Sequence, residues 1–105
     1  MVPQLLSIFL EDAHHRIELI ASALAAKDYP VMAAETHALG SSAATFGLPR
    51  IFNLARQCEQ ALRGSDRATG EVLAHSLVVA AAPALDALSR YARGLEKAQS
   101  NNKLS

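Results

Sequence analysis

The chain has 105 residues, ten Lys or Arg against ten Asp or Glu, no formal net charge and one cysteine, Cys58. That length predicts one domain with one hydrophobic core. A balanced charge without any Lys/Arg run excludes the electrostatic signature of nucleic-acid or anionic-membrane binding. A lone cysteine excludes an internal disulfide and predicts a reducing compartment, the cytoplasm. No apolar run reaches the roughly 18 residues that span a bilayer, and no signal peptide is recognisable.

The first predicted helix runs from about Pro3 to Ala26, where apolar residues recur every three or four positions. Half of the chain is apolar, and Ala and Leu dominate, which favours helix. A short polar connector follows at residues 27–30. Within it, Asp28 is the chemically better N-cap for the next helix, and Pro30 suits that helix's first turn.

The second predicted helix runs to about Phe46, where Gly47 supplies the left-handed position that ends many helices. Pro49 then begins a third helix. That helix ends at Gly64, and Ser65 or Asp66 caps the next one. These connectors are short, so consecutive helices are predicted to be antiparallel neighbours.

The fourth predicted helix spans about Asp66 to Lys97 and contains Pro83. An internal proline loses a hydrogen bond and clashes with the preceding turn at a cost of about 3 kcal/mol. The sequence therefore predicts an all-α, antiparallel up-down-up-down four-helix bundle, with the last helix kinked or broken near Pro83. Residues 1–98 form this domain, 99–105 a frayed tail, and one chain closes the bundle as a monomer.

His37 lies on the side of the second helix opposite Leu39 and Phe46, because successive helical residues advance by about 100°. With Leu39 and Phe46 anchored in the core, the imidazole points outward. Ser41 lies one turn further on. The same stripe otherwise carries only small residues: Ala33, Ala34, Gly40 and Ala44. An exposed ring nitrogen surrounded by small side chains suits a phosphoryl carrier, because a second protein can approach it closely.

Several segments carry a more specific pattern, namely Leu5–Ala13, the Ala-Lys-Asp-Tyr connector, His37-Ala38-Leu39 with Ser42-Ala43 and Phe46-Gly47-Leu48, and Pro49-Arg50 through Leu54-Ala55, Glu59 and Leu62. In this order and spacing, the chain resembles the bacterial histidine phosphotransfer (HPt) domains from Leu5 to about Arg63. The segment after Arg63 is similar more loosely.

The resemblance implies a phosphorelay intermediate rather than an enzyme. An aspartyl phosphate on a response-regulator receiver domain gives its phosphoryl group to His37, which passes it to another receiver; a hybrid histidine kinase is a further implied partner. Neutral imidazole is nucleophilic near the ordinary histidine pKa of about 6.5. The chain is expected to bind no cofactor, since Mg²⁺ belongs to the receiver. Arg50 and Arg56 are candidates to meet the receiver or to screen the phosphate; ordinary solvated charge is the alternative.

Two positions depart from the family pattern, which usually has lysine three residues after the histidine and glycine four after. This chain has Gly40 and Ser41 there. The family's lysine is thought to help hold the phosphate, so its absence keeps a second hypothesis open: a non-phosphorylated module that regulates a receiver, kinase or enzyme. Glycine inside a helix costs about 1 kcal/mol relative to alanine, and close approach of a partner's backbone is one explanation for Gly40.

The remaining candidate residues are assigned no chemistry. His14 and His15 are adjacent and diverge by about 100°, so they predict no metal site. His75 has no partner at a useful spacing, and Cys58 lies on an apolar stripe as a small buried hydrophobe. No metal-ligand cluster, Ser/His/Asp set or Gly-rich phosphate loop is recognisable. The initiating methionine and short tail favour a free-standing protein over a kinase fragment.

Overall fold

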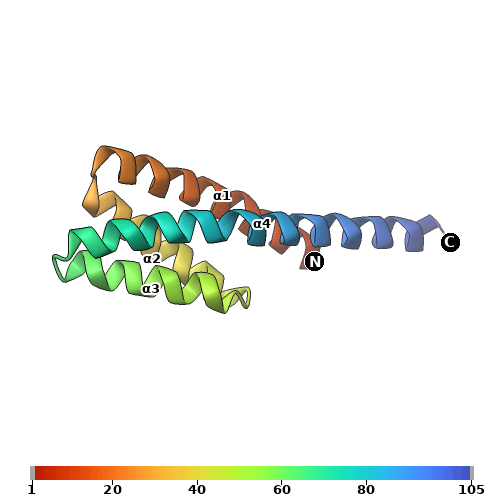
Figure 1. The fold of residues 1–105 in the computed structure, drawn as a ribbon. Helices are drawn as coiled ribbons and strands as arrows, with labels where there is room; N and C mark the ends of the chain where they lie inside the picture. Colours follow the sequence, from red (N-terminus) through yellow and green to blue (C-terminus); the bar gives the residue numbers. More distant parts are fainter. Residues whose placement is uncertain (1, 105) are drawn as a thin grey trace.

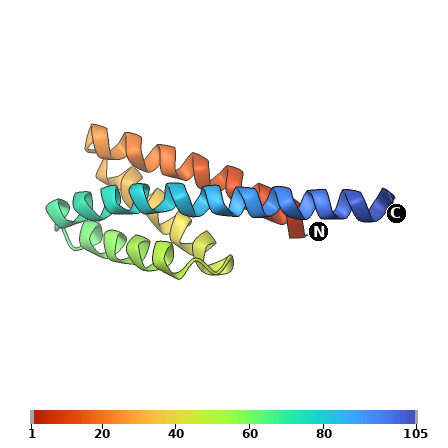
Figure 2. The ribbon, with the colours of Figure 1, turned by 45° about the vertical axis from the view of Figure 1, so that its right-hand side comes forward.

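Four helices make up the computed structural model, which describes the backbone of residues 2–104. They are α1 (Val2–Ala26), α2 (Tyr29–Thr45), α3 (Pro49–Arg63) and α4 (Arg67–Leu104). Consecutive helices run in opposite directions, and α1 and α3 each lie beside both α2 and α4 (Figures 1 and 2). The predicted all-α four-helix bundle is confirmed.

The turns between the helices follow from their capping residues. Asp28 caps α2, because its Oδ1 accepts a hydrogen bond from the Val31 backbone N–H at 3.3 Å. Gly47 has a φ of +69°, the left-handed conformation expected after α2. After α3 the positive φ, 64°, belongs to Ser65 and not to Gly64. Asp66 then accepts from the Thr69 N–H at 3.2 Å and caps α4.

The core contains fully buried side chains from every helix, the largest being Ile20, Met32, Leu39, Leu77, Leu85, Thr36 and Cys58. Leu39 is buried as predicted, and Phe9 of α1 is buried as well. The prediction that Phe46 is also buried is wrong, because its side chain is 36 % exposed at the end of α2. Its ring still stacks on that of Phe9, with the centroids 4.2 Å apart.

Helix α4 is longer and more continuous than the sequence suggested. It passes through Pro83 as one α-helix, so of the two predicted alternatives, a kink or a break, the break does not occur. Pro83 and Val79 are both exposed, so water can reach the carbonyl that the proline leaves without its helical donor. The helix also continues past Lys97 to Leu104 and projects beyond the bundle (Figure 1). The predicted frayed tail is therefore helical to Leu104, and Ser105 lies outside the described residues.

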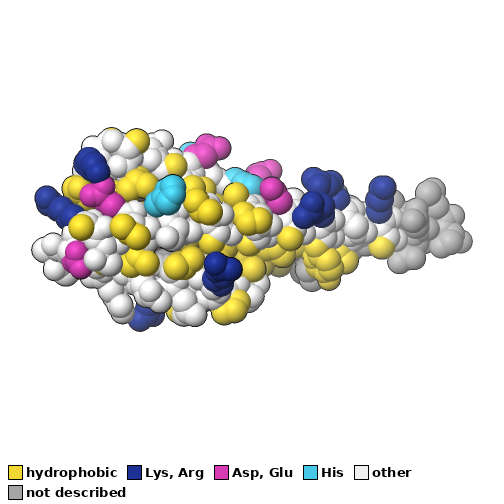
Figure 3. Space-filling model, in the orientation of Figure 1, with side chains coloured by type: hydrophobic (Ala, Val, Ile, Leu, Met, Phe, Trp, Pro, Cys, Tyr) yellow, Lys and Arg dark blue, Asp and Glu magenta, His cyan; other side chains and the backbone are white. Residues whose placement is uncertain are grey.

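The outward face of α4 is apolar, and hydrophobic side chains gather along it (Figure 3). Val72 and Val79 are both exposed there. By length and composition alone, the segment Arg67–Leu95 is long and apolar enough to cross a membrane, so the prediction that no stretch reaches spanning length is wrong on that criterion. Core helices of soluble proteins meet the same criterion, and Leu77 and Leu85 of this segment are buried in the bundle.

Candidate functional site

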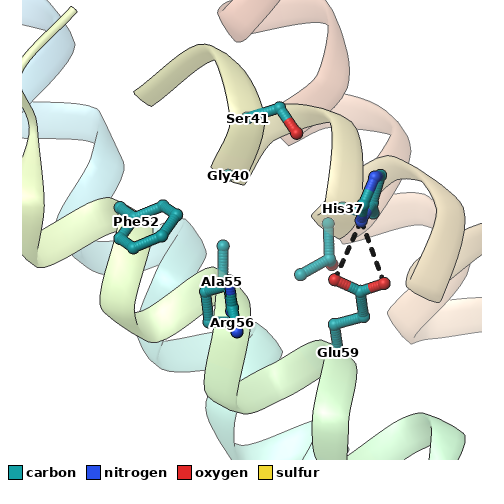
Figure 4. A pocket seen from close by; sticks show the side chains of 8 residues that line it. His37, Gly40, Ser41, Phe52, Ala55, Arg56 and Glu59 are labelled. Carbon is teal, nitrogen blue, oxygen red and sulfur yellow. Dashed lines mark hydrogen bonds and ion pairs between the residues drawn. The ribbon is translucent and has the colours of Figure 1, made fainter. Parts of the chain in front are cut away.

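His37 lies near the middle of α2 and its side chain is 61 % exposed. Its neighbours Thr36 and Leu39 are buried and hold that side of the helix in the core. The outward orientation predicted from the helical spacing is therefore present. Figure 4 shows the imidazole at the edge of a hollow between α2 and α3.

Glu59 of α3 holds one nitrogen of this ring. Both carboxylate oxygens lie 3.0 Å from His37 Nδ1, and the opposite nitrogen, Nε2, points away from Glu59 (Figure 4). A carboxylate is an acceptor, so Nδ1 carries the proton in this pair. In the neutral ring, Nε2 then has the free lone pair. The contact selects Nε2 as the nucleophilic atom and fixes the orientation of the ring.

Arg63, one turn further along α3, completes this arrangement. Its Nε donates to Glu59 Oε2 at 2.7 Å, and the Glu59 side chain is only 14 % exposed. Burial raises the pKa of Glu59, but the hydrogen bonds from His37 and Arg63 outweigh that effect and hold its pKa below the usual value. Glu59 is therefore ionised at neutral pH and can stabilise positive charge that develops on the imidazole.

The hollow beside His37 has a volume of about 190 Å³ and is lined by Thr36, His37, Gly40, Ser41, Phe52, Ala55, Arg56 and Glu59. Gly40 is buried, and a Cβ added to it would lie 3.0 Å from Ala55 Cβ. That separation is tighter than ordinary van der Waals contact. Gly40 thus allows α3 to approach α2 closely, which replaces the explanation that it admits a partner's backbone.

The residues predicted to dock a partner are distributed unevenly around His37. Ala34, Ala44 and Arg56 are exposed, and Ala33 is half-buried. Arg56 shares the hollow with His37. Arg50 is exposed but lines a different groove, between the start of α3 and the Pro83 region of α4. The structure therefore brings Arg56, and not Arg50, to the histidine.

The sequence did not assign a role to Glu59. Its spacing of four residues from both Ala55 and Arg63 places all three on neighbouring turns of one face of α3. That spacing alone could not show that the face meets His37, because the register between α2 and α3 is a tertiary property. In the sequence, Glu59 stands out only as a residue that matches the family pattern.

Other reactive side chains lie apart from this site. His14, His15 and His75 are exposed, and within the described residues no three His, Cys, Asp or Glu side chains are grouped to hold a metal ion. Cys58 is a buried free thiol whose pKa is raised by that burial. A thiol with a raised pKa forms little thiolate and is unreactive, as predicted for a small buried hydrophobe.

A helical bundle in which the exposed His37 has Nδ1 held by a carboxylate and Nε2 open has the architecture of a histidine phosphotransfer module. Comparison with protein families supports this class directly: the Hpt domain family matches residues 4–101, and the chain belongs to that family. Comparisons with curated proteins and with solved structures found no match. Hpt domains act in histidine phosphotransfer within two-component phosphorelays, where they are phosphoryl carriers that interact with receiver domains and kinases.

Proposed function

We propose that this protein is a phosphorelay intermediate that accepts a phosphoryl group on His37 Nε2 from the aspartyl phosphate of one receiver domain and passes it to another. The observation that carries the proposal is the pairing of His37 Nδ1 with Glu59 at 3.0 Å, which leaves Nε2 open on an exposed surface. Membership of the Hpt family supports the same reaction class.

The transfer requires no proton to leave the site. The lone pair of Nε2 attacks phosphorus while the bond from phosphorus to the aspartyl oxygen breaks, and that bond's electron pair stays on the receiver's carboxylate. The imidazole, still protonated at Nδ1, becomes cationic, and the Glu59 carboxylate stabilises that cation across the hydrogen bond. In the onward step an aspartate oxygen attacks phosphorus, the P–N bond breaks, and its electron pair returns to Nε2.

The partner supplies what this chain lacks for phosphoryl transfer. A receiver domain brings Mg²⁺, which neutralises charge on the transferring group, and this chain brings position. Exposed Ala34, Ser41 and Ala44 lie on the His37 side of α2 and permit close approach. As part of the same proposal, the protein acts as a monomer in the cytoplasm; the buried free thiol of Cys58 is consistent with that compartment.

The test is transfer of radiolabelled phosphate from a phosphorylated receiver, with Mg²⁺, to the wild type and to His37→Gln. We expect the wild type to acquire acid-labile phosphate and His37→Gln to acquire none, with the same circular dichroism and unfolding midpoint. His75→Gln is the matched control, because His75 is also an exposed helical histidine but lies on α4. Labelling of His37→Gln at the wild-type rate overturns the assignment.

The second candidate is a module that binds a receiver, kinase or enzyme without being phosphorylated. Gly40 favours it, because this position lacks the family's usual lysine and a side chain here would press on Ala55. This function predicts a receiver affinity that His37→Gln does not change and no acid-labile phosphate on the wild type. A binding titration with the same receiver separates the two functions.

A further inference from the structure

Three arginines of the bundle differ in whether a carboxylate already holds them. Arg63 donates to Glu59, and Arg16 donates to Asp12 and Glu35. Arg56 takes part in none of the ion pairs formed between described residues, although its side chain is exposed and lines the hollow beside His37. It is therefore available to bind an anion that arrives at this hollow.

The packing of α2 on α3 explains why a cation stands on α3 here. Gly40 has no side chain, and Ala55 of α3 fills the space next to it, 3.0 Å from where a Cβ would lie. Arg56 is the next residue along α3, so the close approach that would press a side chain at position 40 on Ala55 also brings this arginine to the hollow. Figure 4 shows Gly40 and His37 on α2 facing Ala55 and Arg56 on α3.

Phe52 keeps the arginine at the hollow. Its half-buried ring lines the same space, and the Arg56 guanidinium carbon lies 5.6 Å from the ring centroid. A guanidinium over an aromatic face is held by a cation–π interaction that does not use its N–H donors for a carboxylate. Those donors remain available, and a guanidinium can bind two phosphate oxygens at once.

We propose that Arg56 is the phosphate-binding residue of this protein, reaching from α3 to the phosphoryl oxygens on His37 Nε2 and replacing the lysine that α2 lacks at Gly40. The inference rests on the proposed function. A phosphoryl group brings close to two negative charges and three acceptor oxygens beside the Glu59 carboxylate, whose charge Arg63 already offsets. Arg56 supplies the further positive charge that the phosphorylated state requires and the unphosphorylated state does not.

A group that binds only the phosphorylated state shifts the equilibrium of the transfer, whereas a group that only docks the receiver changes its rate. The experiment therefore mixes the protein with a radiolabelled receiver that hydrolyses slowly, waits until the distribution is constant, and measures the ratio of phosphoprotein to phosphoreceiver. We expect Arg56→Gln to lower the ratio about three- to fivefold, the range for a partly exposed charged pair. Arg56→Lys, which keeps the charge, should lower the ratio of phosphoprotein to phosphoreceiver by less than Arg56→Gln does.

Arg90→Gln is the matched control, because it removes an exposed arginine from α4 far along the chain from the hollow; it should leave the ratio unchanged. The difference between wild type and Arg56→Gln should also shrink at high salt, because exposed charges are screened. If Arg56→Gln slows the transfer but reaches the wild-type ratio, Arg56 only docks the receiver and the inference is wrong. If the wild type acquires no phosphate at all, the proposed function fails first, and the two failures are distinguishable.

Discussion

Two clusters in this bundle are each built around a glutamate, and only one of them leaves a reactive atom. At the hollow, Glu59 holds His37 Nδ1 and Arg63. At the end of the bundle that carries the α1–α2 turn, Glu71 of α4 accepts from Lys27 Nζ and from the Tyr29 hydroxyl, the latter at 3.0 Å.

The second cluster connects the region where α1 ends and α2 begins to α4 through side-chain hydrogen bonds. Lys27 lies in the turn between α1 and α2 and Tyr29 is the first residue of α2, so their bonds to Glu71 fasten this corner of the bundle to α4. Arg67 of α4 adds to this connection, with its guanidinium carbon 4.6 Å from the Tyr29 ring centroid. Lys27 has a φ of 57°, the left-handed conformation of the residue that follows α1, and the Asp28 N–H closes this helix end by donating to the Ala23 carbonyl at 2.9 Å.

The difference lies in what each partner has left once it is bound. A lysine ammonium or a tyrosine hydroxyl bound by Glu71 has no second group for chemistry. An imidazole bound by Glu59 through Nδ1 still has Nε2, and the bond leaves that atom with the free lone pair. The same acceptor chemistry therefore stabilises the fold in one place and, in the function we propose, prepares a transfer site in the other.

The comparison is tested most strongly by removing the charge of each glutamate while keeping its shape. Glu59→Gln should lower the initial rate of phosphoryl transfer to His37 about tenfold, equal to about 1.4 kcal/mol, because the amide cannot neutralise the imidazolium that forms. Glu71→Gln, which removes the same charge from the other cluster, should leave the rate unchanged. Transfer of radiolabel from a phosphorylated receiver measures both.

Both variants must be compared at saturating receiver concentration, so that a change in docking does not enter the rate. Equal rates for Glu59→Gln and the wild type would contradict the role assigned to the His37–Glu59 bond. A lower rate for Glu71→Gln would instead mean that the second cluster positions the site through the helices.

The helices could be predicted from the sequence because their determinants are local. Apolar spacing defined each one, and Asp28 and Gly47 marked turns with side chains or backbone angles that act within a few residues. Pro83 misled the prediction, because the cost of an internal proline depends on whether the freed carbonyl faces water or the core. Its exposure on the outer face of α4 is a tertiary fact.

For the site, the sequence was enough to predict the exposure of His37 but not its contacts with α3. The spacing of Leu39 and His37 on one helix was enough to turn the imidazole to solvent. The arrangement of Glu59, Arg56 and the Gly40–Ala55 contact depends on how far α2 and α3 slide and how closely they approach. Residues far apart in the sequence meet there, His37 and Glu59 across 22 positions, and no local periodicity fixes that register.

Gly40→Ala tests whether the close approach of α2 and α3 is what builds the first cluster. Helix propensity alone predicts a gain of about 1 kcal/mol, but the new methyl group meets Ala55 Cβ at 3.0 Å, and overpacking costs about 1–3 kcal/mol. We expect a net loss of about 1 kcal/mol in the free energy of unfolding, measured with urea. Transfer to His37 should also slow, because a displaced α3 carries Glu59 away.

Ala55→Gly should reverse part of that loss by restoring the space. In a double-mutant cycle, the pair should be more stable than the two single effects predict. Strict additivity would mean that the contact imposes no constraint. A gain in stability for Gly40→Ala alone would show that α3 gives way freely.

Thr36→Val tests the buried residue that precedes His37 in α2. Thr36 is completely buried, and its Oγ1 has no nitrogen or oxygen partner among the described residues; its hydroxyl can donate to the sulfur of Cys58, which is a weak acceptor. A buried hydroxyl with only a weak partner is destabilising, and valine has nearly the same shape. We expect a gain of about 0.5–1 kcal/mol in the free energy of unfolding with unchanged transfer to His37. A loss of stability would show that the hydroxyl is bound in solution, by water or by a neighbouring group.

The smallest expected effect is on the acid side of the stability curve, where both glutamates contribute. Hydrogen bonds from Lys27 and Tyr29 lower the pKa of Glu71. For Glu59, burial raises the pKa, but the hydrogen bonds from His37 and Arg63 outweigh that effect, so its pKa is lowered as well. A carboxyl whose pKa is lower in the folded state stabilises the fold above its unfolded pKa of about 4.3. That contribution is lost as the pH falls through the folded pKa, because the unfolded state then binds more protons.

Urea unfolding at a series of pH values from about 6 downward measures this loss. The free energy of unfolding should decline less steeply for Glu59→Gln and for Glu71→Gln than for the wild type. An unchanged slope for either variant would mean that its hydrogen bonds do not persist in solution, and only the Glu59 result would bear on the transfer site.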